Sequence, residues 1–191
     1  MSYVPKKYKI KIPNNNIILY CDKKKMITII GPLNVKSLKL KLKLRILEAE
    51  KTIIVTSDSF LNLPNNKKKK IKALQGTTVA LIKQLLIETS STLYKKLKMV
   101  GVGYRAFDIE NFNKKLLMFK LGYSHPIYFK IPKNTTIFCL KLTKLFISGN
   151  SYQDITQTAS LIRSYKLPEP YKGKGILYGD EKIRLKEGKK I

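Results

Sequence analysis

Apolar and charged residues alternate with a period of two over residues 38–46, where leucine or isoleucine takes turns with lysine or arginine. Successive side chains of a β-strand point to opposite faces of its sheet. This segment is therefore predicted to be one strand, with a buried face and a wet face that carries four positive charges. Other short apolar or β-branched runs predict strands over residues 26–30, 51–57, 99–106, 116–121, 126–131, 136–142 and 144–148.

Two further segments repeat apolar residues at helical spacing. One predicts a helix over residues 74–89, and the other predicts a helix over residues 151–165. Ser151 with Asp154 three residues later resembles a capping box at the start of the second helix. Residues 64–70, which read PNNKKKK, are predicted to be an exposed basic loop.

These elements form two successions of similar plan, each with a strand that leads into a helix. The weak repeat predicts an α+β fold of two tandem small units, each an antiparallel-rich sheet packed by one helix. We expect residues 1–93 to form the first unit and residues 94–166 the second. Residues 167–191 are expected to form a basic tail, because its prolines and glycines disfavour a continuous helix or strand.

Charge narrows the possible functions. The 191 residues include 39 Lys and Arg but only 12 Asp and Glu, which gives a formal net charge of +27. With 43% apolar residues the chain can still build a core, so it is expected to be a folded protein whose neighbour is a polyanion. An independent enzyme that acts on neutral metabolites is disfavoured, since a neutral substrate would not compensate the positive charge of the protein.

Several other classes of protein are also disfavoured. Cys21 and Cys139 are too few for a disulfide scaffold and are expected to be reduced, partly buried thiols. With His125 as the single histidine, no zinc site with ligand spacing is expected, and no cofactor is predicted. No apolar run approaches the roughly 20 residues of a membrane-spanning helix. The N-terminus has neither the apolar core of a secretory signal nor the arginines of a transit peptide.

The basic residues are almost all lysine, since only Arg45, Arg105, Arg163 and Arg184 are arginine. Arginine is the better fork for phosphate, so binding chemistry does not explain this bias. An A+T-rich coding sequence would explain it. This suggests an organelle genome, most simply mitochondrial, with a plastid or the cytoplasm of an A+T-rich bacterium as alternatives.

Two glycine-containing motifs look like phosphate loops but lack their context. Residues 101–106, GVGYRA, match the dinucleotide pattern, yet no helix and no acidic ribose partner are predicted after them, so a bulge or close backbone approach is favoured. Residues 171–175, YKGKG, lack P-loop spacing but suit a phosphodiester, because glycine permits close approach, lysine neutralises charge and Tyr171 offers a stacking ring. The alternative for this segment is a solvated mobile tail.

A catalytic pair of Ser124 and His125 is also disfavoured. Neighbouring residues of a strand point to opposite faces, and no orienting acid is evident nearby. A turn-capping or RNA-contacting histidine is preferred.

Three motifs together resemble one family. The segments MVGVGYRA (99–106), LGYSHP (121–126) and PEPYKGKGI (168–176), followed by Tyr178, Asp180-Glu181, Arg184 and the ending KEGKK, resemble the bacterial-type large-subunit ribosomal protein L-six family. Order and spacing agree over residues 95–191, whereas residues 1–94 resemble the family in plan but in few side chains. Gly188 stands where alanine is usual in that family.

The resemblance implies a structural protein rather than an enzyme. It implies binding to large-subunit rRNA near the stalk base and the sarcin–ricin loop, where translation GTPases dock, beside neighbouring large-subunit proteins and with no membrane or small-molecule substrate. The residues it assigns to rRNA binding are Tyr104, Arg105, Tyr123, Ser124, His125, Tyr171, Lys172, Gly173, Lys174, Gly175, Arg184, Lys186, Lys189 and Lys190. Tyr104, Tyr123 and Tyr171 are expected to supply stacking surfaces.

Two alternatives stay open at this point. A free RNA-binding protein, such as a chaperone or regulator, would share the charge without requiring the C-terminal motifs. An RNA-modifying enzyme would need a cofactor loop or an acid–base constellation, and the sequence shows neither.

Overall fold

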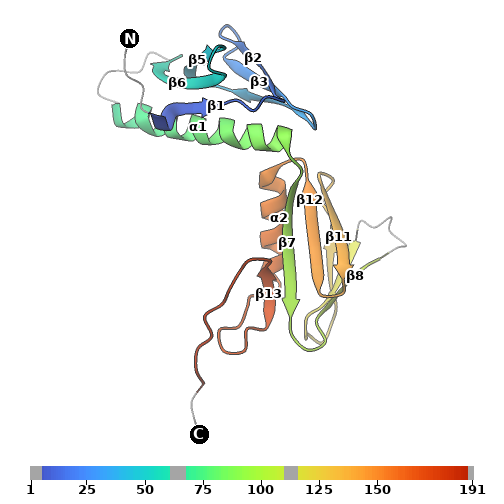
Figure 1. Ribbon diagram of the computed structural model, residues 1–191. Helices are drawn as coiled ribbons and strands as arrows, with labels where there is room; N and C mark the ends of the chain where they lie inside the picture. Colours follow the sequence, from blue (N-terminus) through green and yellow to red (C-terminus); the bar gives the residue numbers. More distant parts are fainter. Residues whose placement is uncertain (1–5, 61–67, 110–115, 189–191) are drawn as a thin grey trace. The chain divides into compact units, whose positions relative to one another are not determined.

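The computed structural model describes residues 6–60, 68–109 and 116–188 and divides into two compact units, Met1–Ser91 and Thr92–Ile191 (Figure 1). Each unit combines antiparallel sheets with one α-helix. The predicted α+β fold class, with two tandem sheet units packed by helices, is confirmed.

In its described part, the first unit holds a short 3-10 helix, six strands and one long helix. These are η1 (Lys6–Tyr8), β1 (Lys9–Lys11), β2 (Ile17–Cys21), β3 (Met26–Ile30), β4 (Val35–Lys39), β5 (Leu42–Leu47), β6 (Thr52–Ser59) and α1 (Lys68–Ser90). The strands form two three-stranded sheets in the orders β1-β6-β5 and β2-β3-β4. Ile27, Ile29, Ile53 and Ile82 are fully buried, so both sheets and α1 share one core.

The second unit repeats this arrangement and extends it. Its elements are β7 (Leu93–Val100), β8 (Arg105–Asp108), β9 (Leu116–Lys120), β10 (Ile127–Lys130), β11 (Thr135–Lys141), β12 (Lys144–Gly149), α2 (Tyr152–Ser164) and β13 (Gly175–Tyr178). Strands β8, β9 and β10 form one sheet, and the other has the order β11-β12-β7-β13. Helix α2 packs on β7 and β12, and its buried Ile155, Ala159 and Ile162 join the core of this unit (Figure 1).

The two units share one strand order. In each, the first strand pairs with the sixth, the next three form a separate meander, the fifth pairs with the sixth, and the helix follows. The repeat inferred from sequence aligned residues 52–57 with residues 145–149, and these lie in β6 and β12, the sixth strands of their units. The second unit differs by β13, which adds to the other edge of β7.

The predicted single strand over residues 38–46 is wrong, because the structure has two strands there in two different sheets. Strand β4 ends at Lys39, and β5 begins at Leu42. The alternation continues across the break, since Leu40 and Leu42 are buried while Lys41 and Lys43 are exposed. Alternation determines which side chains face the core, but it carries no information on which strand is the partner.

A second predicted strand, over residues 99–106, is also divided. Strand β7 ends at Val100 and β8 begins at Arg105, with a turn between them in which Gly101 has φ 153° and Gly103 has φ 76°. These positive φ values suit glycine and reverse the chain. The glycines therefore make a turn rather than a bulge within one strand.

Helix α1 begins at Lys68, so Lys69 and Lys70 belong to its first turns and the predicted basic loop is wrong for them. Lysine is a good helix former, and no proline follows Pro64 to stop the helix. The rest of that predicted loop lies in residues 61–67, outside the described residues.

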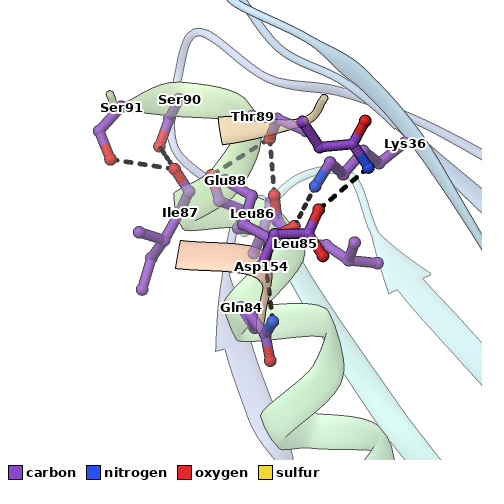
Figure 2. Close-up of polar contacts among 11 residues, drawn as sticks. Lys36, Gln84, Leu85, Leu86, Ile87, Glu88, Thr89, Ser90, Ser91 and Asp154 are labelled. Carbon is purple, nitrogen blue, oxygen red and sulfur yellow. Dashed lines mark hydrogen bonds and ion pairs between the residues drawn. The ribbon is translucent and has the colours of Figure 1, made fainter. Parts of the chain in front are cut away.

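The end of α1 is fastened to the strands of its unit (Figure 2). Glu88 is almost fully buried, forms an ion pair with Lys36 of β4 and accepts a hydrogen bond from Gln84 Nε2 at 2.7 Å. The carbonyl of Thr89 accepts the backbone N–H of Leu33 at 3.2 Å. These bonds fix the last turn of α1 against the turn between β3 and β4.

Helix α2 matches its prediction within one residue at each end, but the capping box does not form. Ser151 is the N-cap in an extended conformation and makes no side-chain cap hydrogen bond. Asp154 instead accepts a hydrogen bond from Asn134 Nδ2 at 3.3 Å. The side chain of Asp154 thus binds Asn134, in the turn before β11, rather than the backbone at the start of its own helix.

The two thiols differ in environment. Cys21, at the end of β2, is exposed, so the prediction that it is partly buried is wrong. Cys139 is half-buried, and its Sγ donates a hydrogen bond to Asp108 Oδ1 at 3.1 Å. Burial and this bond raise the pKa of the Cys139 thiol to about 12, so it stays protonated.

Within the described ranges, no helix is long and apolar enough to cross a membrane. In the same part of the chain, no three His, Cys, Asp or Glu residues are grouped so that they could hold a metal ion.

Candidate nucleic-acid interface

The C-terminal segment is anchored by strand β13, which pairs antiparallel with β7. Ile176 lies opposite Met99 and is fully buried, and Tyr178 lies opposite Leu97. The prediction of a tail without regular structure is therefore wrong for residues 175–178. The four residues from Gly175 to Tyr178 suffice for a strand because β7 offers an edge with unpaired backbone groups.

Ahead of β13 the chain forms a closed loop over residues 166–175. Its neck is a hydrogen bond from the N–H of Ile176 to the carbonyl of Lys166 at 2.9 Å. Inside it, the carbonyl of Glu169 accepts the N–H of Gly173 at 2.9 Å, and the N–H of Glu169 donates to Lys174 at 2.9 Å. The YKGKG motif is therefore held on a defined backbone, and the alternative of a mobile tail does not describe it.

The loop presents its motif unequally to solvent. Tyr171 is 53% exposed and Lys172 is exposed, whereas Lys174 is half-buried. Gly175 is buried with φ 153°, and a Cβ there would lie 2.6 Å from Pro168 Cα. Gly175 thus permits a close approach between two parts of the loop, while Tyr171 and Lys172 project outward.

Beyond β13 the chain returns to the same loop. The N–H of Lys186 donates to the carbonyl of Pro170 at 2.9 Å, and a Cβ on Gly173 would lie 3.4 Å from Leu185. Arg184 and Lys186, on either side of Leu185, are both exposed. Lys189 and Lys190 lie outside the described residues.

The LGYSHP turn, between β9 and β10, contacts the neck of this loop. The hydroxyl of Tyr123 donates to the carbonyl of Tyr165 at 3.0 Å, and Lys166 Nζ lies 4.4 Å from the centre of the Tyr123 ring. The rings of Tyr123 and His125 stack with centroids 6.4 Å apart. Two motifs about 40 residues apart in sequence thus form one surface.

Ser124 and His125 do meet, contrary to the expectation that they point apart. Ser124 Oγ lies 3.5 Å from His125 Nδ1, because both residues are in a turn, where strand alternation does not apply. Both side chains are exposed, and the contact is at the outer limit of hydrogen bonding. The pair is suited to external contacts rather than to activating a nucleophile.

Tyr104 does not supply a stacking surface, and that prediction is wrong. Its side chain is 8% exposed and belongs to the core of the second unit. A Cβ on Gly101 would lie 2.8 Å from its ring, and a Cβ on Gly122 would lie 3.1 Å from it. The ring fills the space that two glycines leave open, so the GVGY motif serves packing.

Arg105, by contrast, is exposed at the start of β8. It lies directly opposite Lys120 of β9 in the antiparallel ladder. Like charges in facing positions destabilise a sheet unless an anion lies between them. Lys120 also precedes Leu121 and Gly122, which lead into the turn of Tyr123 and His125.

Glu181, which follows β13, is engaged by donors from its own unit. Arg163 of α2 binds Glu181 through two hydrogen bonds, from Nη2 at 2.6 Å and from Nε at 3.2 Å. The N–H of Tyr178 donates to the same carboxylate at 3.1 Å. These donors, above all Arg163, hold the pKa of Glu181 below its ordinary value of 4.5.

The ion pairs of the described residues leave the predicted lysines available to an external partner. In the described part of the chain, the ion pairs join Lys36 with Glu88 and Arg163 with Glu181, and neither includes a candidate rRNA-binding residue.

The structure thus brings together Tyr123, His125, the loop of residues 171–175, Arg184 and Lys186. Sequence reasoning missed two cations of this surface, Lys166 and Lys120. Lys166 was detectable as the basic residue before the LPEP motif, and Lys120 as the polar residue that ends a run of apolar strand positions.

Comparison with known proteins agrees with this geometry. A sequence model described as Ribosomal protein L6 matches residues 100–179, which span β8 to β13 and most of the surface just described. The large ribosomal subunit protein uL6 of Mycoplasmoides gallisepticum is 38% identical over 181 residues, which is 94% of this chain and 92% of that protein.

The chain belongs to the ribosomal protein L6 family. A second relative, the uL6 protein of Mycoplasma genitalium, is 42% identical over 86% of this chain and 84% of its own length. The uL6 protein of Mesoplasma florum is 48% identical over 65% of this chain and 67% of its own length. The resemblance recognised from three motifs is confirmed, and membership of the L6 family extends to the first unit.

Replacing Gly175 tests whether the closed loop depends on this residue. Gly175→Ala places a Cβ against Pro168 at a φ that disfavours alanine, so we expect a loss of about 2 kcal/mol or more and release of the segment after residue 165. Thermal unfolding and limited proteolysis measure both effects. Gly188→Ala is the matched control, since nothing lies within 4 Å of its Cβ. Equal stability of the two variants would contradict the described loop.

The Arg163–Glu181 contact predicts a specific pH dependence. The folded pKa of Glu181 lies below its unfolded value, so its stabilisation is complete well above pH 4.5 and disappears as the pH falls below that value. We expect Glu181→Gln to cost about 1 kcal/mol at pH 7 and progressively less toward pH 3. Thermal unfolding at both pH values measures this, with Glu187→Gln as an exposed control. A cost that does not shrink at low pH would contradict the assignment.

Proposed function

We propose that this L6-family chain is a structural constituent of the large ribosomal subunit and acts by binding large-subunit rRNA without turnover. The observation that carries the proposal is the match along 94% of the chain to a large-subunit protein. The net charge of +27 supports it, because a polyanion compensates the repulsion among the lysines.

The rRNA contacts are assigned to the surface around the closed loop. Lysine and arginine side chains neutralise phosphates and release counterions, while Tyr123, His125 and Tyr171 offer rings for stacking. The residues proposed for this surface are Arg105, Tyr123, Ser124, His125, Tyr171, Lys172, Gly173, Lys174, Arg184, Lys186, Lys189 and Lys190, while the predicted Gly175 is buried and closes the loop that carries them. Lys120 and Lys166 join them. Tyr104 contributes indirectly, because its buried ring packs against the backbone of Gly101 and Gly122.

We further propose that the chain braces rRNA near the stalk base and the sarcin–ricin loop, beside neighbouring large-subunit proteins and close to where translation GTPases dock. This position is what the family resemblance of residues 95–191 implies. A mitochondrial location stays a prediction that depends on the lysine bias of the sequence. The bacterial relatives favour the alternative, an A+T-rich bacterial cytoplasm.

Sedimentation of a native lysate through a sucrose gradient tests the proposed function. With the chain followed by mass spectrometry, we expect stoichiometric migration with the large subunit at low and at high salt. A chain that stays near the top of the gradient, or that leaves the particle at modest salt, would instead favour a free RNA-binding protein.

The contribution of the closed loop is tested with Lys172→Ala combined with Lys174→Ala. If both lysines neutralise phosphates, affinity for large-subunit rRNA falls and the slope of log K against log salt becomes shallower by about two. Lys23→Ala combined with Lys24→Ala removes the same charge from an exposed turn of the first unit and serves as the control. An unchanged affinity and slope for the loop variant would exclude its two lysines from the interface.

A further inference from the structure

The solvent face of the sheet β11-β12-β7 carries aromatic side chains that the interface above does not use. Tyr94 is 53% exposed and Phe138 is 56% exposed, with Phe146 partly exposed between them. The rings of Tyr94 and Phe146 stack with centroids 4.9 Å apart and an interplanar angle of 20°. We call the surface of Tyr94, Phe138 and Phe146 the aromatic face.

Strand register places these rings side by side across three strands. Phe138 of β11 lies opposite Phe146 of β12, and Phe146 lies opposite Lys96 of β7. Lys96 Nζ lies 5.4 Å from the centre of the Tyr94 ring. Flat rings and a cation are thus presented together on a sheet surface, which is the arrangement that stacks single-stranded bases.

A row of lysines borders the rings. Lys141 lies opposite Lys144, and Lys144 lies opposite Lys98, so three exposed ammonium groups cross the same three strands. The strands β7, β11, β12 and β13 contain no Asp or Glu in their described residues. Facing cations with no acid among them are stabilised by an external anion, and this favours a nucleic acid over an apolar protein surface.

The fold itself does not require these rings. The corresponding strands of the first unit, β1, β5 and β6, have the same order and contain no aromatic residue. The core of the second unit is built from other side chains, such as Leu97, Leu145 and Ile147, on the opposite face of the sheet. Neither topology nor packing therefore explains the exposed aromatic residues.

The aromatic face is also distinct from the surface around the closed loop. Tyr94 is near the start of β7, whereas Val100, at its end, pairs with Gly175 of the loop. At about 3.3 Å per residue, Tyr94 and Val100 are roughly 20 Å apart along the strand.

We propose that the aromatic face binds a single-stranded segment of RNA, with bases stacked on Phe138, Phe146 and Tyr94 and phosphates paired with Lys96, Lys98 and Lys144. This inference deepens the proposed function and rests on it, because it adds a second rRNA contact to the same protein.

The absence of tryptophan from the chain provides a local test. Phe138→Trp in the full-length protein gives one fluorescent reporter on the aromatic face, and Tyr128→Trp gives one at a 55% exposed position of β10. The probe is a 12-nucleotide oligo(U), titrated at about 0.3 M salt, where purely electrostatic binding is weakened. We expect saturable quenching of the reporter at residue 138 and none at residue 128.

Removal of the side chains gives a second measurement. Phe138→Ala combined with Tyr94→Ala should lower oligo(U) affinity about fivefold or more with little change in salt slope. Lys96→Ala combined with Lys144→Ala should make the slope of log K against log salt shallower by about 1.4, because each phosphate contact with a single strand contributes about 0.7. Tyr128→Ala is the aromatic control, and circular dichroism checks that each variant is folded.

The inference is overturned if the reporter at residue 138 is not quenched, or if both double variants bind oligo(U) like the wild-type protein. It is also overturned if the aromatic variant keeps its RNA affinity but loses a neighbouring protein from the purified subunit, since the face would then be a protein contact. Failure of the proposed function is separate, because it would appear as loss of wild-type co-sedimentation with the large subunit.

Discussion

Strand β7 has two edges, and the organisation of the second unit depends on both of them. One edge pairs with β12 and closes the sheet that α2 covers, and the other pairs with β13 and holds the C-terminal segment. The second pairing attaches the chain after α2 to the sheet, and the loop before β13 is closed by the neck bond between Ile176 and Lys166 and by the backbone bonds of Glu169 with Gly173 and Lys174. A four-residue strand therefore converts a basic sequence into a loop of fixed geometry, and Gly175 allows the loop to close against Pro168.

Cations that face one another are the second constraint. Arg105 faces Lys120 across one ladder, and Lys144 faces Lys98 across another. The carboxylate of Glu181 is engaged by Arg163 and by the backbone of Tyr178, so it does not neutralise these groups. In isolation such pairs cost stability, and a polyanion removes the cost. The folded protein is consequently expected to be more stable inside a ribonucleoprotein particle than free in solution.

The two units have the same strand order but differ in an added strand and in the side chains on the solvent face of the sheet. Both bury isoleucines and leucines between two sheets and a helix, and in both the sixth strand leads into that helix. In the described residues, only the second unit adds a strand to its first strand and places rings on the solvent face of its sheet. The added strand brings Ile176 into the core, whereas the rings lie on the solvent face and point to external contacts.

The sequence by itself determined the fold class, the repeat, most strand positions and the family. Alternation and helical spacing report which residues face a core, and the three motifs between residues 99 and 176 identify the L6 family. Only tertiary structure decided that residues 38–46 belong to two sheets, that Tyr104 is buried on two glycines, and that Ser124 meets His125 in a turn. The physical reason is that a local pattern specifies a face but not a partner. Which strand pairs with β13, and which rings lie side by side across β11, β12 and β7, depends on contacts between residues far apart in the chain.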